Sequence, residues 1–321
     1  MSVPIHPADK SSHSMGGDPD GSLEGSFDET GGGRNPTTAL IEERFSPTPG
    51  GGILYDPACV DLPMDRSADF PANTLFDRSH WASLGALEEF AGGRGSVALI
   101  RANTRSGSGN DDRNANAQAW VLRHYRRGGW AARLSSDRYL WLGAGRTRSF
   151  MEWRLLAQLR RRGLPVPHPV AARYMRGSFT YQADLLTRWL PATRTLAEAI
   201  TGAELPSALW AMVGRTIAAF HREGVQHADL NAGNILLRED LLGTREGDCP
   251  DGPAGGTQAQ AQAPVHLLDF DRGRIRARGA WEGQVLARLE RSLFKIRRLR
   301  EDVRFSDASW RALMAGYERG L

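Results

Sequence analysis

Strand-like and helix-like runs are segregated along this sequence, and their order restricts the fold more than any other feature. Short apolar runs of β-type composition predict strands at 96–101, 119–125, 169–172 and 183–190. Apolar residues at helical spacing predict helices at 146–162, 206–223 and 281–300. Strands with one helix among them, followed by a mainly helical half, favour an α+β fold of two lobes.

Three stretches contain too few large apolar residues to form a core. Residues 1–52 consist largely of Gly, Ser, Asp and Pro, so we expect a disordered tail there. Residues 102–117 and 243–264 have the same character between strand-like runs, so each is predicted to be a loop insertion. The remaining sequence divides into a β-rich N-lobe at 53–190, expected to bind nucleotide, and a catalytic C-lobe at 191–321.

Positive charge in this chain is carried almost entirely by arginine, because Lys10 and Lys295 are the only lysines. The formal net charge is only +4. Such usage is typical of a genome rich in G and C, and binding of phosphate or anionic lipid is a secondary interpretation. No feature indicates a nucleic acid partner or an obligate protein partner.

The two cysteines and the N-terminus limit the cellular setting. Cys59 and Cys249 are too few and too far apart to predict a disulfide framework or a zinc site, so a reducing compartment fits best. No apolar run follows a basic start, and eighteen apolar residues never occur in a row. Neither secretion nor a membrane span is therefore expected, while peripheral attachment to a membrane surface stays open.

The segment from His227 to Asn234 (HADLNAGN) follows the predicted helix 206–223 and precedes an apolar run. It matches H-x-D-L-x-x-x-N, the pattern of kinase catalytic loops. In that pattern the aspartate, here Asp229, accepts or orients the proton of the acceptor hydroxyl, and the asparagine, here Asn234, holds a magnesium ion. A loop of this length brings both side chains to one point, as phosphoryl transfer from ATP requires.

A second motif, LLDFD at 267–271, closes a strand predicted at 266–271 after the second insertion. It resembles D-F-G, whose aspartate binds the metal that bridges the ATP phosphates, with Asp271 in place of the glycine. A charged turn at a strand end would explain the segment by itself. Its position after the first motif makes Asp269 a predicted metal ligand.

The nucleotide lobe carries weaker signals. Gly93 and Gly95 precede the first predicted strand and are candidates for a loop over the phosphates, although an ordinary Gly-rich turn fits equally well. Kinases place a lysine on the third strand, and this chain has no lysine there. Arg123 is the predicted replacement, because its planar fork suits phosphate, and Glu152 on the next helix is its predicted partner. Either residue could also be an ordinary surface charge.

The predicted helix 281–300 is amphipathic and basic. Its apolar stripe is Leu286, Leu289, Leu293 and Ile296. The basic residues around that stripe are Arg288, Arg291, Lys295, Arg297 and Arg298. A helix that packs on the core and has a solvated basic face is the favoured interpretation. The alternative is a surface that rests on anionic lipid headgroups.

Several segments together resemble the 3-deoxy-D-manno-octulosonic acid (Kdo) kinases of lipopolysaccharide core assembly, atypical members of the protein-kinase fold. These segments are WVLRHYRRGG at 120–129, DRYL at 137–140 with RTR at 146–148, GLPVP at 163–167, HADLN at 227–231 and LDFDRG at 268–273. The resemblance extends from about Tyr55 to the C-terminus and leaves out the tail and both insertions. The two insertions depart from what we expect of that family.

This resemblance implies a small β-rich N-lobe and a mainly helical C-lobe, as in protein kinases, with ATP and Mg²⁺ as cofactors. It implies ATP-dependent phosphorylation of the Kdo sugar, at its 4-hydroxyl, on a Kdo-lipid A precursor. The site of action would be the cytoplasmic face of the inner membrane, with the protein attached peripherally to an anionic surface. Asp229 matches the catalytic aspartate of the family.

Two other functions fit parts of the sequence. One is a small atypical Ser/Thr protein kinase of the Rio or Bud type, since such enzymes also use H-x-D-L loops; Ala228 stands where many kinases have arginine. Against it, no A-P-E segment follows Asp269, and little chain remains after Gly273 to dock a peptide. The other is a catalytically dead pseudokinase that serves as a binding module, which the presence of Asp229, Asn234 and Asp269 disfavours.

Overall fold

The computed structural model of the chain describes residues 41–60, 72–89, 97–101, 119–126, 137–243 and 263–321. All of these belong to one contact unit, residues 37–321. The predicted tail up to residue 40 lies outside the described residues, as does most of the two predicted insertions.

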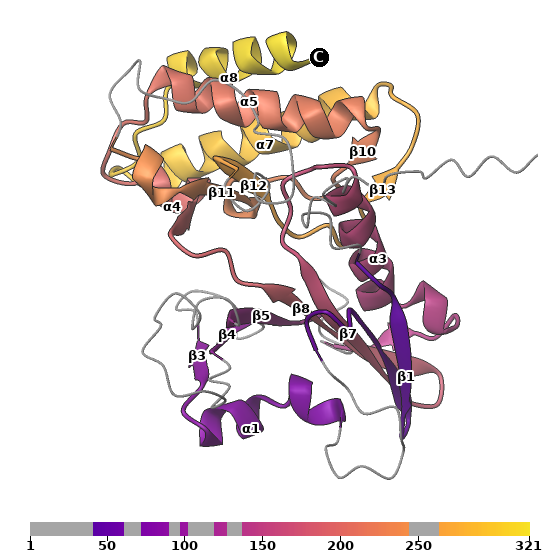
Figure 1. The fold of residues 1–321 in the computed structure, drawn as a ribbon. Coiled ribbons are helices and arrows are strands. Elements are labelled where there is room, and N and C mark those ends of the chain that lie inside the picture. Colours follow the sequence, from indigo (N-terminus) through magenta and orange to yellow (C-terminus); the bar gives the residue numbers. More distant parts are fainter. Residues whose placement is uncertain (1–40, 61–71, 90–96, 102–118, 127–136, 244–262) are drawn as a thin grey trace, which may run out of the picture. The chain divides into compact units, whose positions relative to one another are not determined.

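One antiparallel sheet organises the first half of the described chain (Figure 1). Its strands follow the order β1-β2-β7-β8-β5-β4-β3, and β6 pairs with β8. The bounds are β1 Arg44–Thr48, β2 Gly51–Tyr55, β3 Leu87–Glu89, β4 Val97–Arg101, β5 Ala119–His124, β6 Tyr139–Leu140, β7 Pro169–Arg176 and β8 Thr180–Arg188. The strands predicted at 96–101 and 119–125 are confirmed as β4 and β5, which pair antiparallel from Val97 with Arg123 to Arg101 with Ala119.

Both faces of this sheet are covered, and the alternation of side chains along β2 shows how. Ile53 and Tyr55 pack in a cluster with residues of η1 (Ala72–Phe76) and α1 (Arg78–Ser83). Leu54, between them, faces the other way, toward the core that contains α3 (Arg148–Arg161). The predicted helix 146–162 is therefore confirmed, and its apolar residues Phe150, Trp153, Leu155, Leu156 and Leu159 are buried.

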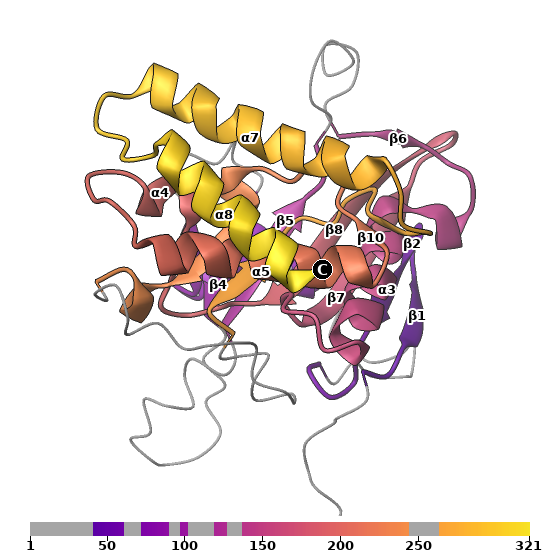
Figure 2. The same cartoon turned by 90° about the horizontal axis from the view of Figure 1, so that it is seen from above.

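Helices dominate the second half, as predicted (Figure 2). The helices are α4 Leu196–Ala199, α5 Ser207–Arg222, α7 Trp281–Leu299 and α8 Asp307–Gly320, with 3-10 turns η4 Ala144–Arg146, η5 Ala232–Asn234 and η6 Glu239–Leu241. Short strands β9 Thr193–Thr195, β11 Ile235–Arg238 and β12 Val265–Leu267 form one small sheet, and β10 Val225–Gln226 pairs with β13 Arg274–Ile275. No helix among the described residues is long and apolar enough to cross a bilayer.

Two predicted boundaries are wrong. The tail was expected to extend to residue 52, but β1 and the start of β2 form an edge hairpin at 44–52. Its glycines are required by packing, since a Cβ on Gly51 would collide with the carbonyl oxygen of Tyr174 on the neighbouring strand. The strand predicted at 266–271 ends at Leu267, because the chain turns sharply there, with φ of 60° at Asp269 and 61° at Arg272.

Candidate active site

His227 opens the predicted catalytic loop and fixes its start. Helix α5 ends before Gly224, whose φ of 70° turns the chain into β10 and on to His227. The His227 ring donates from Nε2 to the carbonyl oxygen of Leu268 at 2.8 Å and accepts at Nδ1 from the backbone N–H of Asp229 at 3.1 Å. Burial lowers the pKa of His227. The ring is therefore a neutral linker that holds the loop beside the second motif.

Side-chain amides cross-link the loop behind Asp229. Asn231 and Asn234 both donate from Nδ2 to the carbonyl oxygen of Asp229, at 3.0 and 2.9 Å. Asn231 Oδ1 also accepts from the N–H of Gly233 at 2.9 Å, which shapes the turn η5. The spacing of the motif thus places Asp229 and Asn234 side by side, as the sequence predicts.

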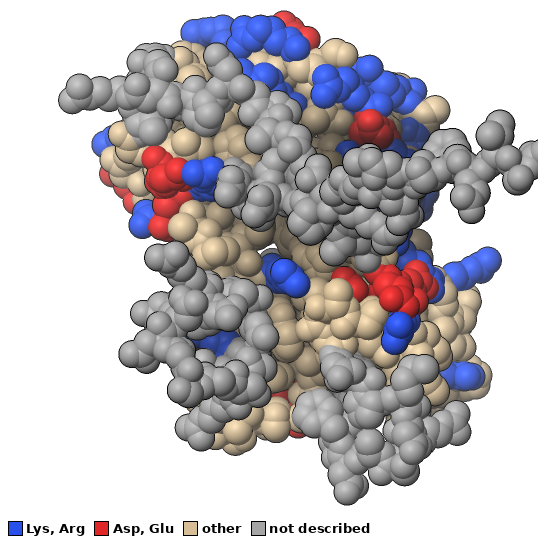
Figure 3. Space-filling model, viewed as in Figure 1, with Lys and Arg blue, Asp and Glu red and all other residues tan. Residues whose placement is uncertain are grey.

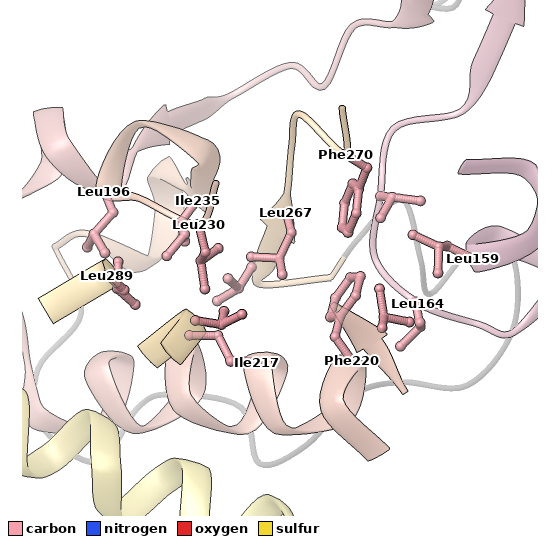
Figure 4. Close-up of a cluster of buried hydrophobic side chains, with 14 of the residues drawn as sticks. Leu159, Leu164, Leu196, Ile217, Phe220, Leu230, Ile235, Leu267, Phe270 and Leu289 are labelled. Atoms are coloured by element: carbon pink, nitrogen blue, oxygen red, sulfur yellow. The ribbon is translucent and has the colours of Figure 1, made fainter. Parts of the chain in front are cut away.

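The second motif joins the loop through strands β11 and β12. The N–H of Leu268 donates to the carbonyl oxygen of Asn234 at 2.9 Å, so Asp269 leaves its strand next to Asn234. Phe270 is buried and stacks on Phe220 of α5, with ring centroids 5.6 Å apart. Figure 4 shows this ring at one end of the buried cluster, near Leu159, Leu164 and Phe220. The apolar anchor fixes the direction of Asp269.

Arg123 lies at the centre of a buried network under the sheet. Its guanidinium forms ion pairs with Glu152 and Asp269 and donates to the Tyr125 hydroxyl at 3.0 Å. Tyr125 in turn donates to Glu152 at 2.5 Å. Burial works against the charge on Arg123, but Glu152, Tyr125 and Asp269 outweigh it and hold its pKa well above the ordinary value. Burial raises the pKa of Glu152, and the positive charge of Arg123 opposes that rise.

A pocket of about 340 Å³ lies where these elements meet, within the range of small-molecule sites. Its lining joins strands of the first half to the loop of the second, and Figure 3 shows an opening between the two halves. The functional side chains among the lining residues are Arg123, Glu152, Asn234 and Asp269. The apolar part of the lining includes Val97, Val121, Leu156, Leu185, Leu190 and Leu236.

Asp229 is joined to this pocket through Asn234, a lining residue whose side chain bonds to the backbone carbonyl of Asp229, and its carboxylate faces helix α7. Its Oδ1 accepts from Arg288 of α7, with Nε at 2.5 Å and Nη2 also bonded. Helix α7 is held against the loop one turn further on, where Ser292 Oγ accepts from the N–H of Ala232 at 3.3 Å. Asp229 therefore contacts both Asn234 of the pocket lining and a basic helix.

The residues present fit a divalent cation and a nucleotide. Asn234 and Asp269 offer an amide oxygen and a carboxylate, the oxygen ligands that Mg²⁺ prefers. Asn234 uses its Nδ2 to bond to the backbone carbonyl of Asp229, so the Oδ1 atom of Asn234 points away from Asp229. Among the described residues, none donates a hydrogen bond to Asn234 Oδ1. A metal held by these two residues would neutralise charge on the phosphates. Arg123 adds a fixed positive charge to the same pocket.

The geometry gathers most of the predicted site residues. Asp229, Asn234 and Asp269 converge from two segments, and Arg123 pairs with Glu152 as expected. The roles given to these residues remain predictions. Gly93 and Gly95 lie outside the described residues.

Sequence reasoning missed three contributors. Tyr125 follows Arg123 by two residues and so shares its strand face, which was a usable signal. Arg148 donates from Nε to Asp271 at 2.7 Å, which gives the residue in the glycine position of D-F-G a structural partner. Arg288 reaches Asp229 across 59 positions, a pairing that no local pattern encodes.

The β-rich lobe, the helical lobe and the pocket that joins a kinase-type loop to a D-F-G-like segment are typical of a kinase-like phosphotransferase. Comparison with known families agrees with this class. The model described as "Lipopolysaccharide kinase (Kdo/WaaP) family" matches residues 99–317. The chain belongs to this family, and it is a kinase that acts on a hydroxyl group.

Several curated proteins named 3-deoxy-D-manno-octulosonic acid kinase are similar to this chain. The one from Xanthomonas axonopodis pv. citri (strain 306) is 46% identical over 273 residues, which are 84% of this chain and 90% of that protein. The one from Xanthomonas campestris pv. campestris (strain B100) is 47% identical over 203 residues, 62% and 70% of the two chains. A solved structure described as "WaaP in complex with acyl carrier protein" covers 78% of this chain and 87% of that chain, with a TM-score of 0.41 and 18% identity.

Proposed function

We propose that this protein transfers the terminal phosphate of ATP, with Mg²⁺, to the 4-hydroxyl of the Kdo sugar in a Kdo-lipid A precursor of the lipopolysaccharide inner core. The observation that carries the proposal is the convergence of Asp229, Asn234, Asp269 and Arg123 in a chain whose relatives are named Kdo kinases. The site supports phosphoryl transfer, and the names of the relatives support the acceptor.

The residues divide the chemistry between them. Asp229 accepts the proton of the acceptor hydroxyl as that oxygen bonds to the terminal phosphorus and the bond to the ADP oxygen breaks. Asn234 and Asp269 would hold the metal, which supplies charge neutralisation on the phosphates. Arg123 stabilises the same negative charge from its position beside Asp269, and Glu152 and Tyr125 fix its orientation.

Attachment to an anionic membrane surface, at the cytoplasmic face of the inner membrane, belongs to the same proposal. Its support is α7, on which Arg291, Lys295 and Arg298 are exposed at helical spacing, and no described acidic partner is recorded for them. Lys and Arg side chains also gather over the helical half in Figure 3. Sedimentation with phosphatidylglycerol vesicles at two salt concentrations tests this part. Binding that weakens at high salt is expected, and no salt-sensitive binding would rule out the basic face.

The acceptor is tested by incubating purified protein and labelled ATP with Kdo-lipid A and, separately, with a generic protein substrate. We expect label in the lipid fraction only. Phosphorus-proton NMR of the product should then place the phosphate on carbon 4 of the sugar. Label in the protein substrate instead would replace the proposal with an atypical protein kinase.

A further inference from the structure

Arg288 occupies the acceptor side of the catalytic aspartate. Helix α7 is fixed there by buried Val285, Leu289 and Leu293, so the position of Arg288 is set by the core. Both bonding nitrogens of Arg288 reach the same oxygen, Asp229 Oδ1. No contact to Oδ2 is recorded among the described residues, so a hydroxyl can approach Asp229 from that side with the guanidinium as its neighbour.

The charges around Asp229 show why an acidic acceptor needs such a neighbour. Asp229 and Asp269 are carboxylates, and a bound triphosphate adds further negative charge to the same place. Arg123 is already committed to Glu152 and Asp269. A sugar that carries a carboxylate would be repelled from Asp229 unless a cation compensated it. Among the described residues, Arg288 is the cation that pairs with Asp229.

The ion pair between Arg288 and Asp229 is weak enough for Arg288 to exchange its partner. The side chains of Arg288 and Asp229 are 50% and 43% exposed, and exposed ion pairs contribute at most about 1 kcal/mol. An incoming carboxylate can therefore replace Asp229 as the partner of the guanidinium at little cost. Asp229 would then be released to accept the hydroxyl proton.

We propose that Arg288 recognises the carboxylate of the acidic sugar acceptor and, by taking it as partner in place of Asp229, positions the reactive hydroxyl at the released aspartate. This inference rests on the proposed function, because it assumes the acidic sugar. It adds a specificity-determining residue that the motifs do not contain.

The test combines two acceptors with three proteins in detergent solution, where membrane binding plays no part. The acceptors are Kdo-lipid A and its carboxyl methyl ester, and the proteins are wild type, Arg288→Gln and Arg311→Gln. Arg311 is an exposed arginine of α8 and serves as the matched control for loss of one surface charge. Arg288→Lys, which keeps the charge without the planar fork, is measured as a second variant.

We expect esterification to lower kcat/KM of the wild type by about 10- to 100-fold, as for loss of a charge-assisted hydrogen bond. Arg288→Gln should lose about the same factor on the acid and lose no more on the ester, with KM for ATP unchanged. Arg288→Lys should fall between the two, and Arg311→Gln should match the wild type.

Two results would overturn the inference while the proposed function stands. One is an equal loss of Arg288→Gln on both acceptors, which would mean that Arg288 acts on Asp229 or the phosphate. The other is a wild type that uses acid and ester equally well. A wild type that phosphorylates neither sugar, yet hydrolyses or transfers from ATP elsewhere, would instead overturn the proposed function and the inference with it.

Discussion

Two arginine-carboxylate contacts flank the transfer site, and they differ in environment more than in chemistry. Arg123 and Glu152 have side chains that are 20% and 2% exposed, whereas Arg288 and Asp229 are 50% and 43% exposed. A buried charge is costly unless it is paired, so the Arg123 pair is permanent once the protein folds. An exposed pair is weak and can be exchanged. The nucleotide side of the site is thus preorganised, and the acceptor side is adaptable.

This division suits the two substrates. The triphosphate presents the same charge in every cycle, and fixed positive charge stabilises its transition state without reorganisation. In the proposed reaction the acceptor brings a hydroxyl to Asp229, and an exposed carboxylate whose partner can be exchanged would admit it.

The substitution Asp229→Ala removes the proposed proton acceptor and should have the largest effect on the acceptor side. We expect kcat to fall by about 10²- to 10⁴-fold, because the proton of the hydroxyl loses its acceptor, while KM for ATP stays near the wild-type value. The Asp229 side chain is 43% exposed, so the unfolding transition of the variant should remain cooperative. Asp240→Ala, which breaks the exposed pair with Arg238, is the matched control and should leave turnover intact. Near-wild-type turnover of Asp229→Ala would remove the aspartate from the mechanism.

The nucleotide side should respond in stability as well as in activity. Arg123→Ala leaves Glu152 buried without its cation, which costs about 3–5 kcal/mol of unfolding free energy in buried pairs. Denaturant unfolding of the two proteins measures this loss, and steady-state kinetics should show strongly weakened use of ATP.

A double variant separates the two effects of Arg123. In Arg123→Leu with Glu152→Leu, both buried charges are gone, so much of the stability should return while transfer stays lost. If the double variant regained normal ATP kinetics, the positive charge at this position would have no role in catalysis.

The buried pair, Arg123 with Glu152, could be predicted from the sequence. Arg123 stands in a predicted strand, directly after the apolar run 119–122, and the absence of lysine from that strand directs attention to it. Glu152 follows on an amphipathic helix with a clear apolar face. The kinase pattern, which pairs a strand cation with a helical glutamate, therefore predicts the contact between the two residues, and the structure confirms it.

The exposed pair, Arg288 with Asp229, could not be predicted from the sequence. Helix α7 was predicted within one residue of its end, but its rotation against the loop depends on how buried residues such as Leu289 pack. No spacing rule relates Arg288 to Asp229 across the intervening segment. Helix α8 escaped prediction for a similar reason, since its Gly316 makes a close crossing with α5, where a Cβ would collide with Ala211, and that fit exists only in the folded chain.

Lower pH should reduce the unfolding free energy through buried histidines, and His221 is the residue at which this effect can be measured. Burial lowers its pKa to about 4, while in the unfolded chain it is near the ordinary value of 6.5. Below about pH 6.5 the unfolded chain binds a proton that the folded chain refuses, so the unfolding free energy falls, by about 2 kcal/mol for this group at pH 5.

The variant His221→Phe should lack this pH dependence. At pH 7 it loses the 2.8 Å hydrogen bond to the Tyr317 hydroxyl, at a cost of about 1 kcal/mol. The gap to the wild type should narrow as the pH falls from 6.5 and reverse by about pH 5. His168 and His227 titrate in the same direction in both proteins, so the difference between the two curves isolates His221. Parallel curves would show that His221 is not buried as a neutral ring.

The smallest change in stability is expected at Arg288, whose side chain is half exposed. Arg288→Gln should change the unfolding free energy by less than about 1 kcal/mol, because water can solvate Asp229 once its partner is gone. The same substitution should lower kcat/KM for the acidic acceptor far more than this change in stability. Denaturant unfolding at low and high salt measures the first quantity, and the difference from wild type should shrink further in high salt. A loss of several kcal/mol would place Arg288 with Arg123 among the fixed structural cations and remove the contrast between the two sides of the site.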